Sequence, residues 1–411
     1  MNNAIRLNQT FYIQGRVYME NLSGNMLIAH GGGPTPVING SLQGALMEAK
    51  KHPEIKKVYA ARYGAEGILA NDLIDLTNLD DEAIANLSNT PSSTIGSCRR
   101  KLKEADYPAV LDCLKKNDIR FFFYNGGNDS MDTCAKISKL AEDSGYPVNV
   151  IGIPKTVDND LIITDHCPGF GSAARYAAVS TLELSFDANT MKDHIEIFEA
   201  MGRNAGWITA AASLFQDQMP SELLVYLPEV TFNKEKFIAD VKKALAKGRG
   251  LVIAVSEGIC YENGKCVGDT GAVDGFGHAV LSGVGEELAK ILNDEVKVKT
   301  RANKPGALGR CSATMQSPVD IEEAIAAGAF AVRSAVEGKT GYMAAIVADR
   351  DGDGYKFHMD LAPLSEVANA EKKFPVEWMN EEKNGITEGF KEYCLPLIGG
   401  WNKKFSYLRE L

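Results

Sequence analysis

The sequence lacks any apolar run close to the roughly 20 residues that span a bilayer. Its longest apolar runs, such as residues 251–255 and 341–348, have the length of strands. Residues 1–25 also lack the continuous apolar core of a secretory signal. We therefore expect no membrane association and no secretion, and we predict a cytoplasmic location.

Basic charge is also scarce. The 411 residues include 44 Lys and Arg against 54 Asp and Glu, which gives a formal net charge of -10. Proteins that bind nucleic acids usually present a basic face, so we expect no nucleic-acid partner. An anionic ligand must then be held by local cations rather than by the field of the whole chain.

The 8 cysteines form no C-x-x-C pair. Cys260 and Cys266 have no second pair at ligand spacing, which argues against a zinc site. We therefore expect reduced thiols, most of which pack as small hydrophobic side chains. Glycine, in contrast, is plentiful: many of the 39 glycines adjoin apolar runs, where tight turns and phosphate-binding loops occur.

Short apolar runs alternate with amphipathic segments along the chain. Contiguous apolar positions are typical of strands covered on both faces. They predict strands at residues 26–30, 57–62, 120–125, 148–153, 195–199, 222–226, 251–256 and 342–348. Helical spacing predicts helices at residues 39–51, 106–117, 130–144, 232–246, 277–292 and 320–336. This alternation predicts a mostly parallel α/β fold.

Two glycine-rich turns follow predicted strands and precede predicted helices, at residues 29–40 (AHGGGPTPVING) and 121–130 (FFFYNGGNDS). Ligands of open α/β sheets bind at the carboxyl ends of strands, and a helix N-terminus favours an anion. The first turn is equally well explained as a plain connection, and Asp129 or Ser130 as a helix cap. Two such turns in one chain make the cap alone a weaker explanation.

Two further segments carry reactive side chains. Residues 151–160 (IGIPKTVDND) place a cation, a hydroxyl and two carboxylates after a strand. Phosphoryl transfer needs a base for the acceptor hydroxyl, a cation for the transferred group and acidic groups near Mg²⁺. Residues 199–207 (EAMGRNAGW) place Arg203 between a strand end and a helix start, where a guanidinium is well placed to hold an oxyanion.

Taken together, the strings PKTVDND, GGNDS and MGR resemble the phosphofructokinase family, from about residue 26 to about residue 360. The resemblance implies two Rossmann-like three-layer α/β domains with mostly parallel sheets and an active site in the cleft between them. It also implies an enzyme of glycolysis or gluconeogenesis that transfers a phosphoryl group to the 1-hydroxyl of fructose 6-phosphate, with Mg²⁺ as cofactor.

The resemblance assigns a role to each matching residue. Asp158 is the base for the 1-hydroxyl, and Lys155 and Arg203 act with it in catalysis. Contacts to the donor phosphates fall to Gly33, Arg99 and Asp129. Contacts to the sugar phosphate fall to Thr156, Asp160, Met201, Gly202, Glu257, Arg301 and Arg310. Because Arg301 matches a residue supplied to a neighbouring subunit, we expect a homodimer or homotetramer.

Two positions indicate the donor. ATP-using members of the family have glycine where this chain has Asp129 and Lys155. The carboxylate at the first position repels the α-phosphate of a nucleotide, and the lysine at the second can neutralise a transferring or leaving phosphate. A chain with both residues resembles the diphosphate-dependent class, whose reaction runs in both directions. An ATP-dependent enzyme with an unusual donor pocket, or a non-catalytic paralogue that only binds sugar phosphate, stays open as an alternative.

The chain departs from the family in two places that matter below. Asn128 stands where the ATP enzymes have an aspartate associated with Mg²⁺, and an amide oxygen is a weaker ligand for this cation. The expected metal ligands are therefore Asn128 and Asp129, with Asp158 as another candidate. His194 stands where many members carry an arginine that crosses between subunits.

The resemblance also sets expected domain boundaries. Residues 1–22 are an N-terminal extension, of which 1–18 are loosely packed or reflect a misplaced start. The donor domain comprises residues 23–169 and 309–358, and the fructose 6-phosphate domain comprises residues 170–308 and 359–411.

A rival motif lies at residues 349–354 (DRDGDG), where Asp360 at the twelfth place fits the spacing of a calcium-binding EF loop. The flanking segments have the pattern of strands rather than helices. We therefore predict a β-hairpin turn at this string.

Overall fold

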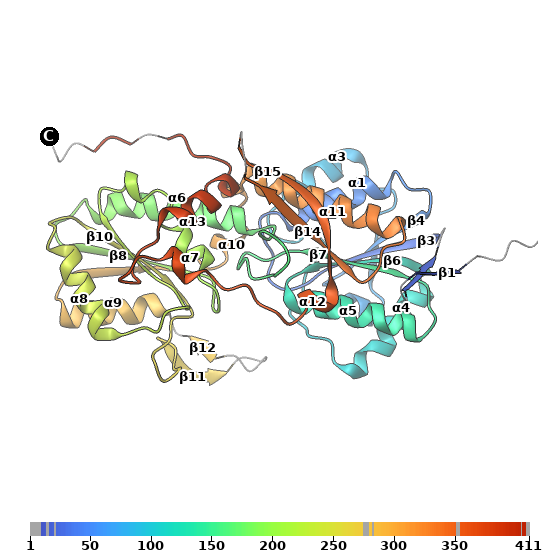
Figure 1. Cartoon of the computed structure of the whole chain (residues 1–411), viewed down its shortest axis with the longest axis horizontal. Helices are drawn as coiled ribbons and strands as arrows, with labels where there is room; N and C mark the ends of the chain where they lie inside the picture. Colours follow the sequence, from blue (N-terminus) through green and yellow to red (C-terminus); the bar gives the residue numbers. More distant parts are fainter. Residues whose placement is uncertain are drawn as a thin grey trace, which may run out of the picture. The chain divides into compact units, whose positions relative to one another are not determined.

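The chain forms two α/β units, as the computed structural model in Figure 1 shows. The structure describes residues 10–13, 16–19, 22–273, 279–281, 283–350, 354–403 and 405–407. The first unit comprises residues 1–156, 161–169 and 321–371. The second comprises residues 157–160, 170–320 and 372–411. The chain thus passes between the units more than once, as the sequence predicted.

The first unit is built on a 7-stranded sheet with the order β15-β14-β7-β6-β3-β4-β5. The inner strands are parallel, and the edge strands β5 and β15 are antiparallel to their neighbours. The strands are β3 (Gly24–His30), β4 (Ile55–Ala61), β5 (Leu73–Asp75), β6 (Ile119–Gly126), β7 (Asn149–Pro154), β14 (Tyr342–Asp349) and β15 (Lys356–Pro363).

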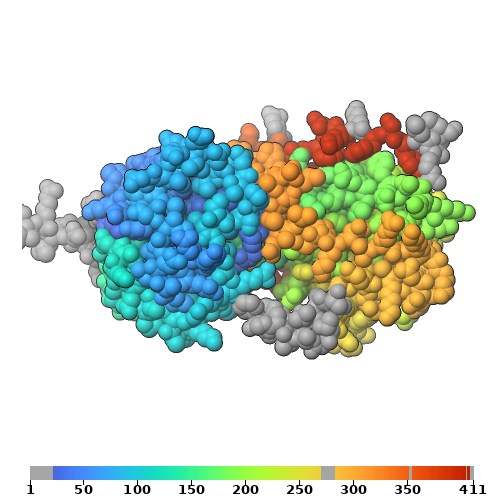
Figure 2. Space-filling view, turned by 180° about the vertical axis from the view of Figure 1, so that it is seen from behind, coloured from blue at the N-terminus to red at the C-terminus, as the bar shows by residue number. Residues whose placement is uncertain are grey.

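Helices cover both faces of this sheet. On β6, Phe121 and Phe123 pack toward one face, and Phe122 and Tyr124 toward the other, so the apolar run of this strand is buried on both sides. One face is covered by α1 (Ile38–Ala49), α3 (Asp81–Asn86) and α11 (Pro318–Val336). The other is covered by α2 (Ala65–Ala70), α4 (Tyr107–Lys116), α5 (Asn128–Asp143) and α12 (Leu364–Val367). In the space-filling view, the early part of the chain, in blue, forms much of one surface of this unit (Figure 2).

The second unit is built on a 4-stranded parallel sheet with the order β13-β8-β10-β9. The strands are β8 (His194–Ala200), β9 (Glu222–Tyr226), β10 (Leu251–Ser256) and β13 (Lys299–Asn303). The helices are α6 (Phe170–Ala188), α7 (Trp207–Ala211), α8 (Lys234–Leu245), α9 (Val284–Glu295), α10 (Leu308–Cys311) and α13 (Glu388–Cys394). Figure 1 shows α6 on one side of this sheet and α8 and α9 on the other, so this unit is also layered.

All the predicted strands and the α/β fold class are confirmed. The sequence pattern missed α6, because this helix is rich in small residues and is buried on most of its surface, so it has no polar face. It also missed β13, whose exposed Lys299 and Arg301 give this edge strand a polar character. α9 begins at Val284, later than the predicted residue 277.

The division between the units agrees with the sequence prediction at residue 169 and differs elsewhere. The first unit ends at residue 371 rather than 358, because β15 pairs with β14 along its whole length, from Lys356 to Pro363. Residues 309–320 belong to the second unit rather than the first, because α10 packs against α6. Residues 157–160 also belong to the second unit.

The antiparallel pairing of β14 and β15 confirms strands on both sides of residues 349–354 and contradicts an EF loop, which needs flanking helices. Residues 351–353 of that string lie outside the described part of the chain. Across the described residues, no helix has the length and apolar character needed to cross a membrane.

Two small hairpins complete the fold: β1 (Thr10–Ile13) with β2 (Arg16–Met19), and β11 (Asp269–Val273) with β12 (Ala279–Leu281). The first lies in the predicted N-terminal extension, most of which is outside the described residues. The expectation of reduced thiols is wrong for one pair, since Cys260 and Cys266 form a disulfide. The two residues face each other across a tight turn closed by the hydrogen bond from Tyr261 N to Lys265 O, of 2.9 Å.

Candidate active site

The residues predicted to bind the donor lie in the first unit, at the carboxyl ends of β3, β6 and β7, which are neighbours in the sheet. The turns after these strands therefore meet at one edge, where ligands of α/β sheets bind. We call this set, with the segment that carries Arg99 and with Thr156, which adjoins Lys155 but was predicted to contact the sugar, the donor group: Gly33, Arg99, Asn128, Asp129, Lys155 and Thr156.

The glycine turn after β3 is held by the segment before Arg99. Gly32 N donates to Cys98 O at 2.9 Å, and Ser97 Oγ donates to Gly32 O at 2.7 Å. Gly31 N donates to Asn125 O at 2.9 Å. Among the described residues, Gly33 N–H has no partner, so it is the amide of this turn best able to bind an anion.

Lys155 is only 4% exposed, and its Nζ donates to Gly33 O at 2.8 Å. Gly32 has a φ of 77°, and a Cβ at this position would lie 3.2 Å from Lys155 Nζ, so the turn requires glycine here. Burial, and then the Lys155 charge, lower the pKa of the neighbouring His30 to about 3. His30 is therefore neutral at physiological pH, and Lys155 is the cation of this buried corner.

Asp129 lies in the first turn of α5, where the helix dipole favours a carboxylate. Its side chain is 75% exposed and forms an ion pair with Lys101 Nζ at 2.9 Å. The hydrogen bond and charge of Asp129 raise the pKa of Lys101. The sequence analysis missed Lys101, although the cation run RRK at residues 99–101 was a signal for it.

Asn128 makes two hydrogen bonds to the segment after α12. Its Oδ1 accepts from Asn369 N at 2.7 Å, and its Nδ2 donates to Ala370 O at 2.5 Å. The amide thus ties the start of α5 to this segment. Of the two predicted metal ligands, Asp129 is the one whose oxygens face solvent.

Thr156 ends the donor group and forms a parallel bridge with Gly169. The segment that contains Gly169 is anchored by a buried ion cluster, in which His166 contacts Asp165 at 2.8 Å and Glu323 at 2.7 Å. Burial disfavours a charged His166, but Glu323 and Asp165 outweigh it and raise the pKa of His166 to about 9. Arg350 adds a two-pronged ion pair to Asp165.

Apart from Thr156, the residues predicted to bind the sugar lie in the second unit. Together with Asp158 and Arg203, which were predicted to act in catalysis, we call them the sugar group: Asp158, Asp160, Met201, Gly202, Arg203, Glu257, Arg301 and Arg310. Met201 to Arg203 follow β8 and Glu257 follows β10. The two strands are paired with Ser256 opposite Ala200, so these residues meet at the carboxyl edge of the sheet. Arg203 is exposed there.

Backbone contacts fix this edge. Glu257 N donates to Ala200 O at 3.0 Å, and Ser256 Oγ donates to Gly202 O. A Cβ on Gly258 would lie 1.7 Å from Arg203 O, so only glycine allows this approach. Burial raises the pKa of Glu257, against the charges of Arg203 and Lys304.

Lys304 is a second cation that the sequence analysis missed. Its Nζ lies 2.6 Å from Glu199 Oε1, a buried carboxylate at the end of β8. Arg310, in α10, has a buried Nε without a hydrogen-bond partner among the described residues. Such a donor calls for an acceptor, and a phosphate oxygen would supply one.

Asp158 and Asp160 lie in a loop whose other residues are anchored. Asn159 is fully buried with a φ of 55°, and its Nδ2 donates to Tyr393 Oη at 3.0 Å. Asp160 O accepts from Lys372 N at 2.7 Å. Asp158, between Val157 and Asn159, is half-buried. The anchors restrict the backbone on its C-terminal side, which favours a fixed position for a base.

One predicted residue lies apart from this edge. Arg301 is on β13 opposite Glu196, near the amino end of β8, and its side chain is 51% exposed. It does not join Arg203 and Glu257 within its own chain, and its role in a neighbouring subunit stays a prediction.

Comparisons with known proteins point to one family. The family model described as "Phosphofructokinase" matches residues 25–335. The chain is 42% identical over 386 residues to the pyrophosphate–fructose 6-phosphate 1-phosphotransferase of Halomonas elongata, covering 92% of each protein. It is 43% identical to the protein of the same name from Methylococcus capsulatus, again covering 92% of each. The crystal structure of the pyrophosphate-dependent phosphofructokinase of Nitrosospira multiformis is 40% identical, with a TM-score of 0.83 over 94% of this chain and 95% of that one. The chain belongs to the phosphofructokinase family.

Proposed function

We propose that the chain transfers a phosphoryl group from diphosphate to the 1-hydroxyl of D-fructose 6-phosphate, giving D-fructose 1,6-bisphosphate and phosphate. The observation that carries this proposal is the charge pattern of the donor group. Asp129 pairs with Lys101 at the start of α5, and Lys155 is buried beside the glycine turn. The similar relatives of Halomonas elongata and Methylococcus capsulatus are named for the same reaction.

The donor group favours diphosphate over a nucleotide. Members of the family that use ATP have glycine at the positions of Asp129 and Lys155. The pair of Asp129 and Lys101 fills space with two side chains at the start of α5, and the carboxylate repels an α-phosphate. Lys155 supplies a fixed charge for the transferred or leaving phosphate. The phosphate that leaves can in turn attack the 1-phosphoryl group of fructose 1,6-bisphosphate and expel the sugar oxygen, so the reaction runs in both directions.

In the reaction, Asp158 accepts the proton of the 1-hydroxyl as its oxygen attacks a phosphorus atom of diphosphate. The bond from this phosphorus to the bridging oxygen breaks, and the other phosphate leaves with the electron pair. Lys155 and Arg203 stabilise the charge on the transferred group and on the leaving oxygen.

The remaining residues bind the two substrates. Gly33 N–H and Arg99 hold the oxygens of diphosphate. Thr156, Asp160, Met201 and Gly202 line the sugar, and the carboxylate of Glu257 accepts a hydrogen bond from a sugar hydroxyl. Arg310 holds the 6-phosphate through its buried Nε, and Arg301 contributes to the 6-phosphate site of a neighbouring subunit.

Mg²⁺ is part of the proposal. It binds with near-octahedral geometry to substrate phosphates, waters and one or two protein carboxylates. The exposed carboxylate of Asp129 fits this requirement through Oδ2, since its Oδ1 accepts from Lys101 Nζ at 2.9 Å, whereas the single side-chain oxygen of Asn128 already accepts a hydrogen bond from Asn369 N at 2.7 Å. When bound, the ion would neutralise charge on the diphosphate.

A cytoplasmic location and a homodimer or homotetramer remain predictions. The exposed Arg301 side chain supports the second of these.

The test is the ratio of kcat/KM for diphosphate to kcat/KM for ATP, with fructose 6-phosphate and Mg²⁺ present. We expect the wild-type ratio to exceed about 100, and Asp129→Gly to lower it at least about 10-fold. Asp143→Gly, the same change in the last turn of the same helix, is the matched control and should leave the ratio unchanged. A ratio below one would support the ATP-dependent alternative. Tight binding of fructose 6-phosphate without turnover of either donor would support the non-catalytic one.

A further inference from the structure

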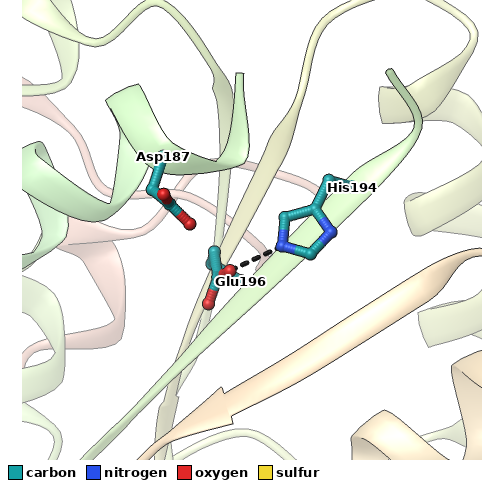
Figure 3. A group of neighbouring side chains, drawn as sticks. All are labelled: Asp187, His194 and Glu196. Atoms are coloured by element: carbon teal, nitrogen blue, oxygen red, sulfur yellow. Dashed lines mark hydrogen bonds and ion pairs between the residues drawn. The ribbon is translucent and has the colours of Figure 1, made fainter. Parts of the chain in front are cut away.

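Three ligating side chains converge at the amino end of β8, away from the carboxyl end that carries Arg203 (Figure 3). His194 and Glu196 are two positions apart on the strand, so they point to the same side. Asp187 reaches them from the last turn of α6. One imidazole nitrogen and one oxygen from each carboxylate all lie within 4.8 Å of one another.

Arg301 offers this cluster only a loose counter-charge. Glu196 is 2% exposed and Asp187 is 58% exposed. Arg301 Nη1 lies 4.0 Å from Glu196 and 3.9 Å from Asp187, distances too long for hydrogen bonds. This half-exposed guanidinium is therefore a loose counter-charge for the buried Glu196 carboxylate, whose close partners are His194 and Asn303.

The cluster also has outer support of the kind that metal ligands have. Asn303 on the adjacent strand β13 donates from Nδ2 to Glu196 Oε2 at 2.6 Å. The other oxygen, Oε1, lies 2.6 Å from His194 Nε2. Glu196 is thus held with one oxygen toward His194, and such outer contacts orient the ligands of metal sites.

We propose that Asp187, His194 and Glu196 bind a first-row divalent transition-metal ion, for which Zn²⁺ is the probe. One imidazole and two carboxylates suit such an ion, and a water completes a tetrahedron. The two carboxylates balance its charge. The ion replaces the hydrogen bond between His194 and Glu196 and displaces Arg301 from the cluster.

None of the three ligands belongs to the donor group or the sugar group, although His194 stands where many members of the family carry an arginine that crosses between subunits. The link of this site to the function is Arg301: the ion would displace this side chain from Asp187 and Glu196, and a neighbouring sugar phosphate would attract it away from them. The two binding events should therefore strengthen each other. That link alone rests on the proposed function.

Isothermal titration of the full chain with Zn²⁺, after dialysis against a chelator, tests the site. We expect one ion per chain, and absorption bands of a four-coordinate ion when Co²⁺ is used. Asp187→Asn should weaken binding at least about 10-fold, and Asn303→Ala about 10- to 100-fold. Arg301→Ala should strengthen it, because the competing cation is gone.

His52→Ala is the matched control, because His52 contacts Glu48 at 3.1 Å and the described residues offer this pair no third ligand, so this variant should bind like the wild type. Asp187 is exposed, so Asp187→Asn should fold normally, which thermal melting would verify. The proposal is overturned if the wild type binds no Zn²⁺ below about 100 μM. Equal binding by wild type and Asp187→Asn, or weaker binding by Arg301→Ala, would also overturn it.

Discussion

Replacing Lys155 with methionine removes the buried cation of the donor group and nearly keeps the length of the side chain. Lys155 is 4% exposed, so little solvent screens its charge. Two unit charges about 4 Å apart interact by about 4 kcal/mol at an effective dielectric constant of about 20. Only the part of this energy that grows as charge develops in the transition state raises kcat.

Removing one preorganised electrostatic group typically lowers kcat by about 100- to 1,000-fold. We expect a loss in this range for Lys155→Met. The KM for fructose 6-phosphate should change less than about 3-fold, because uniform binding of the sugar is untouched. This expectation rests on the division of the chain, since Arg203 and Glu257 of the sugar group belong to the second unit, whereas Lys155 belongs to the first.

The assay is steady-state kinetics with diphosphate as the varied donor, alongside Lys139→Met as the control. Lys139 is on α5 in the same unit, and its side chain is 76% exposed. A second readout is the pKa of His30 by NMR. It should rise from about 3 when the Lys155 charge is lost, yet stay below its ordinary value of 6.5 because burial is the larger cause. A Lys155→Met enzyme with near wild-type kcat would refute the assignment.

Three further predictions follow from the structure. Asp158→Ala should lower kcat by about 100- to 10,000-fold, and retained turnover would mean that another group is the base. Because the pKa of His166 is raised to about 9, its charge stabilises the fold fully below pH 6.5. That contribution, about 3 kcal/mol, should be lost as pH rises from 6.5 through 9. Denaturant unfolding across this range should show the loss in wild type and a smaller loss in Glu323→Gln, which keeps Asp165, and a flat wild-type profile would contradict it. Asn128→Ala should lower the free energy of unfolding by about 1–3 kcal/mol without changing the Mg²⁺ concentration for half-maximal activity, and a rise in that concentration would make Asn128 a metal ligand.

Much of the fold could be predicted from the sequence, because the inner strands of both sheets are buried on both faces and appear as contiguous apolar runs. β6, with Phe121, Phe122 and Phe123 all fully buried, is the clearest case. The helix α6 could not be predicted in this way, since its burial leaves no polar stripe. The edge strand β13 has too few apolar residues to stand out.

In the candidate site, the residues whose positions could be predicted are those that directly follow a strand. Lys155 and Glu257 directly follow buried strands, so their positions followed from the pattern. Contacts between distant parts of the chain left no local signal. The amide of Asn128 contacts Asn369, which is 241 residues away, and Asn159 contacts Tyr393, which is 234 residues away.

The central claim is that diphosphate is the phosphoryl donor. The most direct test is ³¹P NMR of the chain with fructose 6-phosphate, diphosphate and Mg²⁺ in the absence of nucleotide. We predict that the diphosphate signal falls while the signals of phosphate and fructose 1,6-bisphosphate rise, and that the reverse mixture regenerates diphosphate. An unchanged diphosphate signal, together with conversion of added ATP to ADP, would contradict the account.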